Sequence, residues 1–233
     1  MITRKNLDDL YNWALKGNFP MKGNPTSPNY SNKKPKAKIY SKAYTSLIGV
    51  MLSAQSQDQR TAIACKQLFA LADTPEDMIK LSQDEVIQAI KPAGLHNAKS
   101  KNILATSKIL LEKFNGKVPQ TQKELMTLPG VGRKSSDIVM RFVFGQPHIA
   151  VDTHVFRMLW RLGWADSLDE GKASITVNNT TPDKYKYGAH MWLITHAKRI
   201  CKSRSPDCDP VSYTHLRAHE TGRNLVCRLL LEK

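Results

Sequence analysis

Two cysteines near the end of the chain have a spacing that could bind a metal. Cys201 and Cys208 are separated by six residues, and a thiolate is a strong metal ligand. A cluster-binding loop would supply two more thiolates within about ten residues, but the next cysteine is Cys227. The fourth cysteine, Cys65, stands in the apolar segment TAIACKQLF and is expected on the core face of a helix. The chain therefore holds the beginning of a metal site without its completion.

A glycine-rich turn, LPGVGRK at residues 128–134, could bind an anion. Glycine tolerates a positive φ and a close approach of another backbone, and the residues after the turn have a helical pattern. The free N–H groups at the start of such a helix attract a phosphate, as in DNA. A tight turn between two packed helices, without any ligand, would explain the turn by itself equally well.

A helical pattern covers almost the whole chain, and no alternating strand pattern stands out. Helices must therefore position the cysteines and the glycine-rich turn. Prolines, glycines and a run of lysines predict a loop at residues 17–40. We therefore expect an all-α protein with short loops, in two lobes. Helical segments are expected at 4–16, 44–54, 99–114, 132–144, 151–163 and 185–201, with helix starts at Thr74-Pro75, at the capping boxes Ser82–Glu85 and Thr121–Glu124, and a helix end at Asn115-Gly116.

The charge of the chain indicates a polyanionic partner. The 233 residues carry a formal net charge of +15, which favours nucleic acid. A solvated basic surface without such a partner is the alternative, and a ribosomal or RNA-binding protein would explain the charge alone. No apolar run approaches the roughly 20 residues that span a bilayer, and the N-terminus lacks the apolar block of a signal peptide. We expect a cytosolic protein that does not attach to membranes.

Four motifs together resemble those of the helix-hairpin-helix DNA glycosylases of the endonuclease III family. They are VMLSAQSQ (50–57), GLHNAKSKNI (94–103), LPGVGRK (128–134) and IAVDTHVFR (149–157). The resemblance implies a two-lobed all-α fold. Its parts would be a six-helix barrel at 41–147 with the hairpin at 121–145, a second lobe from 1–40 and 148–209 that normally carries an iron–sulfur cluster, and a tail at 210–233.

The same resemblance implies a base-excision-repair DNA glycosylase with abasic-site lyase activity. It would act as a monomer in the cytoplasm, at the nucleoid, on oxidised pyrimidines and abasic sites in duplex DNA. Lys134 would be the nucleophile that attacks C1′ of a flipped nucleotide and forms a Schiff base. The positive end of the helix dipole disfavours an ammonium group there. Asp152 would support this attack and stabilise positive charge on the sugar, besides capping a helix. His154 is expected to be structural.

Base flipping leaves a gap in the duplex, and the resemblance implies that two side chains fill it. Gln55 and Leu95 stand at the matching positions of two separate loops. The hairpin residues Leu128, Gly130, Val131, Gly132 and Arg133 would bind the DNA backbone without reading its sequence.

Two alternatives share parts of this pattern. An adenine-specific mismatch glycosylase of the same superfamily has no lysine in its hairpin motif and carries a glutamate where this chain has Gly49. A non-catalytic helix-hairpin-helix module that only grips DNA would need no lysine–aspartate pair. Both alternatives are therefore less favoured than the bifunctional enzyme.

The resemblance also shows what the cysteine site lacks. The family binds a [4Fe–4S] cluster through cysteines spaced C-x6-C-x2-C-x5-C, and Val211 and Arg217 stand at the last two positions. The segments VSYTHLRAHET (211–221) and NLVCRLLLEK (224–233) look like translated sequencing adapters. We therefore interpret residues after Asp209 as adapter read-through, in which case the native protein completes the cluster and this chain does not.

Overall fold

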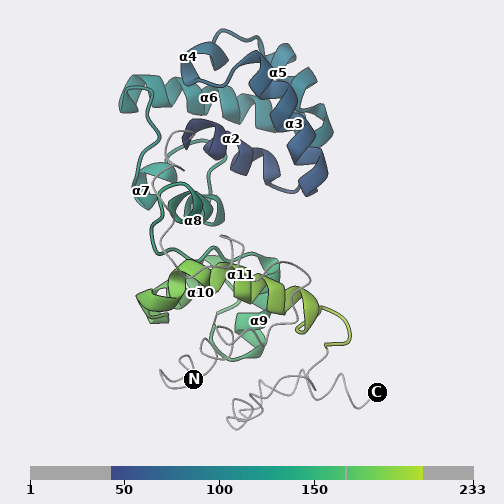
Figure 1. Ribbon diagram of the computed structural model, residues 1–233, viewed down its shortest axis with the longest axis vertical. Helices are drawn as coiled ribbons and strands as arrows, with labels where there is room; N and C mark the ends of the chain where they lie inside the picture. The colour runs from purple at the N-terminus through teal and green to yellow at the C-terminus, as the bar shows by residue number, and fades with distance from the viewer. Residues whose placement is uncertain (1–42, 166, 207–233) are drawn as a thin grey trace. The chain divides into compact units, whose positions relative to one another are not determined.

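The computed structural model describes residues 43–165 and 167–206. The expected helix at 4–16, the loop at 17–40, Cys208 and the tail at 210–233 lie outside the described residues. Within the described ranges the chain is helical and contains no strand, which confirms the prediction of an all-α fold (Figure 1). The helices are α2 (Ala43–Ser53), α3 (Asp58–Leu71), α4 (Pro75–Met78), α5 (Gln83–Ile90), the 3₁₀ helix η2 (Lys91–Ala93), α6 (His96–Phe114), α7 (Gln122–Leu125), α8 (Arg133–Phe142), α9 (Thr153–Arg161), α10 (Glu170–Thr180) and α11 (Asp183–Arg199).

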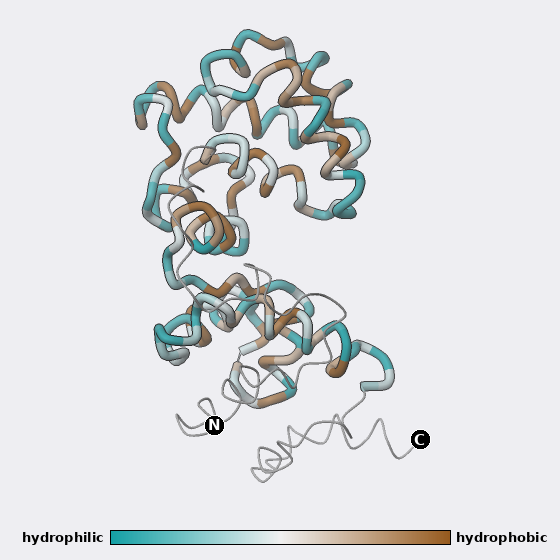
Figure 2. The backbone as a smooth tube through the Cα atoms, viewed as in Figure 1, coloured by the Kyte–Doolittle hydropathy of each residue, from teal (hydrophilic) through white to brown (hydrophobic). Residues whose placement is uncertain are grey.

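The described residues form two compact units that meet in sequence between Gln146 and Pro147. Each unit has its own cluster of buried apolar side chains. Figure 2 shows apolar and polar stretches interleaved along the helices of both units, as expected of helices that bury one face.

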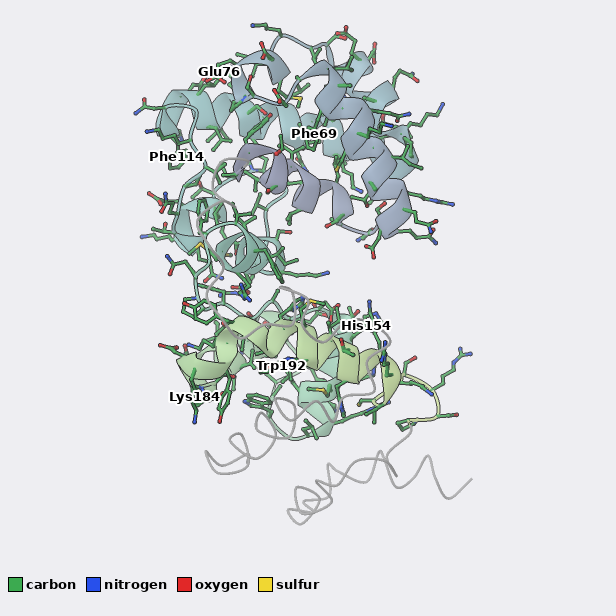
Figure 3. All side chains as sticks on the ribbon, in the orientation of Figure 1. Phe69, Glu76, Phe114, His154, Lys184 and Trp192 are labelled. Carbon is green, nitrogen blue, oxygen red and sulfur yellow. The ribbon has the colours of Figure 1, made fainter. Side chains whose placement is uncertain are left out.

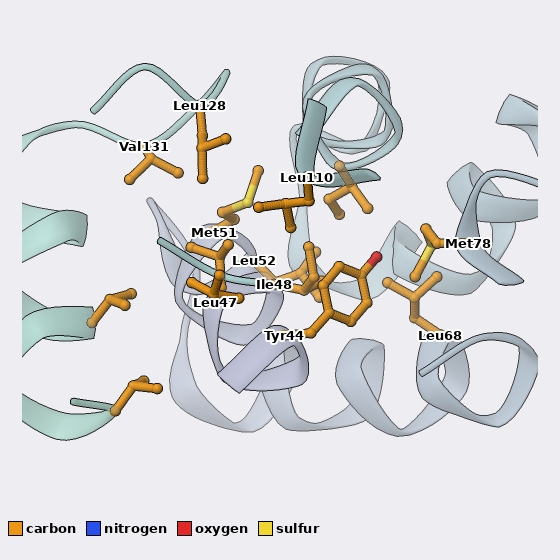
Figure 4. Close-up of a cluster of buried hydrophobic side chains, with 14 of the residues drawn as sticks. Tyr44, Leu47, Ile48, Met51, Leu52, Leu68, Met78, Leu110, Leu128 and Val131 are labelled. Atoms are coloured by element: carbon orange, nitrogen blue, oxygen red, sulfur yellow. The ribbon is translucent and has the colours of Figure 1, made fainter. Parts of the chain in front are cut away.

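The unit that ends at Gln146 contains α2 to α8. The helix α2 is central to its core, and it packs against α3, α6 and α8. Residues at helical spacing on α2 are fully or almost fully buried, and they meet side chains from α3, α4 and α6 and from the turn before α8 (Figure 4). The Tyr44 hydroxyl lies 2.6 Å from the Ser107 hydroxyl and joins α2 to α6 by a buried hydrogen bond.

The other described unit contains α9, α10 and α11. The helix α11 packs against α9, and Trp192 lies in the core between them (Figure 3). The indole of Trp192 covers Gly188 one turn earlier, so closely that a Cβ atom at Gly188 would collide with it. A glycine is therefore required in the middle of this helix.

Most helix ends follow the predicted capping signals. Thr74 caps α4 with Pro75 at its first position, and Ser82 and Glu85 form a complete capping box. Asn115 ends α6 in the left-handed conformation, and Gly116 follows with φ 72°. These predictions are confirmed.

Three details differ from the sequence-based expectations. The Thr121 hydroxyl accepts from the Glu124 N–H, but the Glu124 carboxylate accepts from that hydroxyl rather than from the backbone. The helix α6 begins at His96, three residues earlier than expected. The helix α10 was not predicted; it is capped by Asp169, whose carboxylate accepts from the N–H groups of Gly171 and Lys172.

None of the helices within the described residues is long and apolar enough to cross a membrane.

Candidate active site

The glycine-rich turn joins α7 to α8 in a helix-hairpin-helix. Gly130 has φ 79°, and a Cβ atom there would lie 2.8 Å from Nδ2 of Asn102 on α6. The hydroxyl of Thr106, also on α6, donates to the Pro129 carbonyl at 3.1 Å. The turn is therefore pressed against α6, and Gly130 is the residue that permits this contact.

The side chains of Leu128 and Val131 anchor the turn in the core of its unit. Their exposed fractions are 2% and 5% (Figure 4). Val131 also donates its N–H to the Leu128 carbonyl at 3.1 Å. The Leu128 N–H in turn donates to the Leu125 carbonyl at 3.1 Å. These two residues therefore anchor the turn, and the exposed backbone of the hairpin is that of Gly130 and Gly132.

The helix α8 starts directly after the turn, and no side chain caps it. Gly132 is the N-cap residue, and the first turn carries Arg133 and Lys134 but no acidic residue. The Lys134 side chain is exposed. Uncapped N–H groups together with two cations favour binding of an anion such as a DNA phosphate.

A partly buried polar link holds α7 against α8. Gln122 on α7 accepts a hydrogen bond from Arg133 at 3.3 Å and donates to Oδ1 of Asp137 at 2.6 Å. Asp137 is completely buried. The link fixes the orientation of the first turn of α8, which carries Lys134.

Gln55 and Leu95, the two predicted gap-filling residues, lie on the rim of one pocket. The pocket has a volume of about 160 Å³, and both residues adopt the left-handed backbone conformation, with φ 52° and 49°. That conformation costs a non-glycine residue roughly 1–2 kcal/mol. Leu95 is 56% exposed although it is apolar. The pocket is lined by Met51, Ala54, Gln55, Leu95, Ala98, Lys99, Asn102 and Gly130.

Asp152 lies in the other unit, at the end of an extended segment that two helices hold. The Asn178 side chain of α10 accepts from the Ile149 N–H and donates to its carbonyl. Nδ1 of His190 on α11 lies 2.8 Å from the Ala150 carbonyl. The Asp152 carboxylate then accepts from the Val155 N–H at 2.8 Å and caps α9, as predicted.

Cys201 follows the end of α11 and is buried. Two arginines of α9 hold the backbone here: Arg157 donates to the carbonyls of Ala197 and Cys201, and Arg161 donates to those of Lys202 and Ser203. In residues 43–165 and 167–206, no group of three or more His, Cys, Asp or Glu side chains could hold a metal ion.

Cys65 belongs to α3 and packs half-buried against the core of the unit that ends at Gln146. Burial raises the pKa of its thiol. This placement agrees with the expected structural role.

Comparisons with known proteins agree with this geometry. Residues 48–179 match the family model of the HhH-GPD superfamily base excision DNA repair proteins. Endonuclease III of Rickettsia felis is 43% identical over 180 residues, which cover 77% of this chain and 84% of that protein. Endonuclease III of Escherichia coli strain K12 is 40% identical over 169 residues, or 72% and 80% of the two chains.

Solved structures show the same relationship. A non-covalent endonuclease III–DNA complex superposes with a TM-score of 0.74 at 32% identity, covering 93% of this chain and 95% of that one. A trapped endonuclease III–DNA covalent intermediate gives a TM-score of 0.75 at 32% identity, with 93% and 96% covered. The fold and the hairpin thus define a base excision DNA repair protein of the helix-hairpin-helix class. Within that class, the chain belongs to the endonuclease III family, and the resemblance found in the sequence is confirmed.

The family generally carries a [4Fe–4S] cluster, but the residues of this chain do not fit one. Four thiolates hold such a cluster. Cys201 and Cys208 have the required spacing, Val211 and Arg217 replace the other two ligands, and Cys65 belongs to the core of the other unit.

Sequence reasoning missed the residues that support the site from behind. They are the polar residues Asn102, Gln122, Asp137, Asn178 and Lys99, whose types are common on helix surfaces and carry no signal of a supporting role. Only the packing of the helices brings them to the turn, the pocket and the Asp152 segment.

Proposed function

We propose that the chain removes oxidised pyrimidines from duplex DNA and then cleaves the strand at the resulting abasic site, with Lys134 as the nucleophile. The observation that carries the proposal is the exposed Lys134 in the first turn of an uncapped helix, directly behind a turn shaped to approach a DNA backbone. Membership in the endonuclease III family supports the same activity.

The reaction begins when the neutral amine of Lys134 attacks C1′ of the flipped nucleotide. The bond between C1′ and the base breaks, and the base leaves with the bonding electrons and takes up a proton. The nitrogen then loses a proton, and its electron pair forms the C1′=N bond while the C1′–O4′ bond breaks and O4′ takes up a proton. The sugar ring is now open, and the product is a protonated Schiff base. The proton on the adjacent C2′ is then acidic, and its removal expels the 3′ phosphate, which cuts the strand.

Asp152 contributes negative charge to this reaction. Its carboxylate supports attack by the lysine and stabilises the positive charge that develops on the sugar. The hydrogen bonds of Asn178 and His190 to the preceding backbone support this role, because they hold the carboxylate in one place before the substrate arrives. His154 is proposed to be structural.

Duplex DNA is the partner, and the hairpin and the pocket rim are its proposed contacts. Gly130, Gly132 and Arg133 offer backbone N–H groups and a cation to a phosphate, with Leu128 and Val131 behind them. Gln55 and Leu95 fill the gap that the flipped nucleotide leaves. The left-handed backbone of the exposed Leu95 supports this role, because strain of this kind is found most often at functional sites.

The two lobes are proposed to divide these tasks. The first, 41–147, carries the lysine and the DNA-contacting loops, and the second, 1–40 with 148–209, carries Asp152. The tail at 210–233 is proposed to be non-native. No step of the proposed reaction passes through a metal cluster.

The test is cleavage of a labelled duplex that contains one oxidised pyrimidine. Wild type is expected to release the base and cut the strand, whereas Lys134→Gln is expected to do neither while still binding the duplex. Lys113→Gln, which removes another exposed lysine of the same unit, is the control and should retain full activity. Release of adenine from a mismatch by the wild type, without action on pyrimidines, would favour the mismatch-glycosylase alternative. DNA binding with no base release would favour the non-catalytic module.

A further inference from the structure

One buried lysine connects the two loops that carry Gln55 and Leu95. Lys99 stands in the first turn of α6, and only 7% of it is exposed. Its ammonium group donates to the Leu52 carbonyl at 2.7 Å and to the Ala93 carbonyl at 3.1 Å. Both acceptors are backbone atoms, and they lie in separate elements, α2 and η2.

The two carbonyls lie just before the two strained residues. Leu52 is in the last turn of α2, three positions before Gln55, and Ala93 ends η2, two positions before Leu95. The backbone N–H of Lys99 also donates to the Leu95 carbonyl at 3.0 Å. Lys99 therefore binds the backbone that leads into Gln55 and the backbone that leads into Leu95. It also lines the pocket that these two residues share.

We propose that Lys99 is a positioning residue whose ammonium ties the end of α2 to the turn before α6, and so sets the separation of the Gln55 and Leu95 side chains that enter the gap in the duplex. The inference rests on the proposed function, since it assumes that these side chains fill the gap. A lysine suits the task because one ammonium can donate to several carbonyls at once, and the last carbonyls of a helix lack partners within it. Burial lowers the pKa of Lys99, whereas the two carbonyls that accept from its ammonium group favour the charged form.

The test measures how well the duplex gap is filled. A duplex carries a stable abasic analogue with the fluorescent base 2-aminopurine opposite it, and the fluorescence is read at saturating protein. Wild type is expected to raise the fluorescence, because the inserted side chains unstack the opposite base. Lys99→Met is expected to lose at least about half of this rise and to lower kcat/KM for lesion excision between about tenfold and about a hundredfold.

Two further variants separate positioning from simple destabilisation. Tyr44→Phe removes another buried hydrogen bond of the same unit, 2.6 Å to Ser107, and should leave the fluorescence rise unchanged. In the double variant Lys99→Met/Leu95→Ala, the loss of excision should be clearly smaller than the product of the two single losses, because both act through the same inserted side chain. Should Lys99→Met not fold, Lys99→Gln replaces it, because its shorter amide reaches at most one of the two carbonyls.

A full wild-type rise in the Lys99 variant, or losses that multiply in the double variant, would overturn the inference. Covalent trapping of the wild type on an abasic duplex, measured alongside, keeps the two proposals apart. If trapping succeeds and the Lys99 variant behaves as wild type, only the inference about Lys99 fails. If the wild type does not trap, the proposed function itself fails.

Discussion

At the scale of single residues, Asp152 has two tasks that substitutions can separate. Its carboxylate caps α9 through the Val155 N–H, and its charge is proposed to stabilise the sugar cation. Asparagine is as good an N-cap as aspartate but carries no charge. Asp152→Asn should therefore change the free energy of unfolding little, yet slow base excision by about a hundredfold or more.

The comparison that completes this prediction is Asp152→Ala. It should lose the same activity and also about 1 kcal/mol of stability, because the cap is gone. Thermal unfolding and single-turnover excision are the two measurements. Near-normal excision by Asp152→Asn would show that the carboxylate has no part in the chemistry.

The sequence indicates the residues that are proposed to meet the substrate better than it indicates the residues that hold them. Lys134, Gln55 and Leu95 stand in recognisable motifs, and the structure shows the first exposed and the other two together on one rim. Lys99 belongs to one of these motifs, but a lysine on a helix is ordinarily a solvated charge. Its burial depends on where α2 and η2 end in space, which local patterns do not determine.

At the scale of elements, the two glycines of the hairpin should differ in what they do. Gly130 has φ 79° and would press a Cβ atom against Asn102, whereas Gly132 has φ −87° and no atom within 4 Å of an added Cβ. Gly130→Ala should therefore destabilise the unit by about 1–2 kcal/mol or more. Gly132→Ala should cost less, because its backbone conformation suits alanine and only the preference of the N-cap position for glycine is lost.

The same pair tests the proposed phosphate site. An added methyl group at Gly132 stands where a DNA backbone would approach the start of α8, so Gly132→Ala should weaken DNA binding more than Gly130→Ala does, although it lowers the melting temperature less. Equilibrium binding to an abasic-analogue duplex measures this effect. Unchanged affinity in Gly132→Ala would remove this turn from the DNA interface.

The helix start at the complete capping box could be predicted, whereas the starts of α6 and α10 could not. Ser82 and Glu85 predicted the start of α5 because both hydrogen bonds of the box are local. The start of α6 was wrong by three residues, because its N-cap is the strained Leu95, a residue type that carries no capping signal. The helix α10 lacks a strong apolar stripe, and its place depends on packing against α9.

At the scale of the whole molecule, the cysteine pattern predicts a protein without its family's cluster. Two of the four ligand positions hold Val211 and Arg217, and two thiolates do not complete a [4Fe–4S] site. The purified chain should therefore lack the yellow-brown colour and the iron of such a cluster. Iron analysis is the measurement, and a full complement of four irons per chain would contradict this expectation.

A double substitution provides the comparison. Val211→Cys with Arg217→Cys restores the spacing C-x6-C-x2-C-x5-C, and bound iron should rise above that of the unaltered chain after reconstitution. Lys134, Gln55, Leu95 and the hairpin all belong to the unit that ends at Gln146. We therefore expect the DNA-contacting loops to keep their local structure whether or not iron binds.

The central claim is that Lys134 forms a covalent bond with DNA, and borohydride trapping on an abasic duplex tests it most directly. Borohydride reduces a Schiff base to a stable amine, so each reacting protein becomes permanently attached to the labelled strand. Wild type and Lys113→Gln should trap equally, while Lys134→Ala should bind the duplex without trapping, and peptide mapping should place the adduct on Lys134. Equal trapping by wild type and Lys134→Ala would contradict the account.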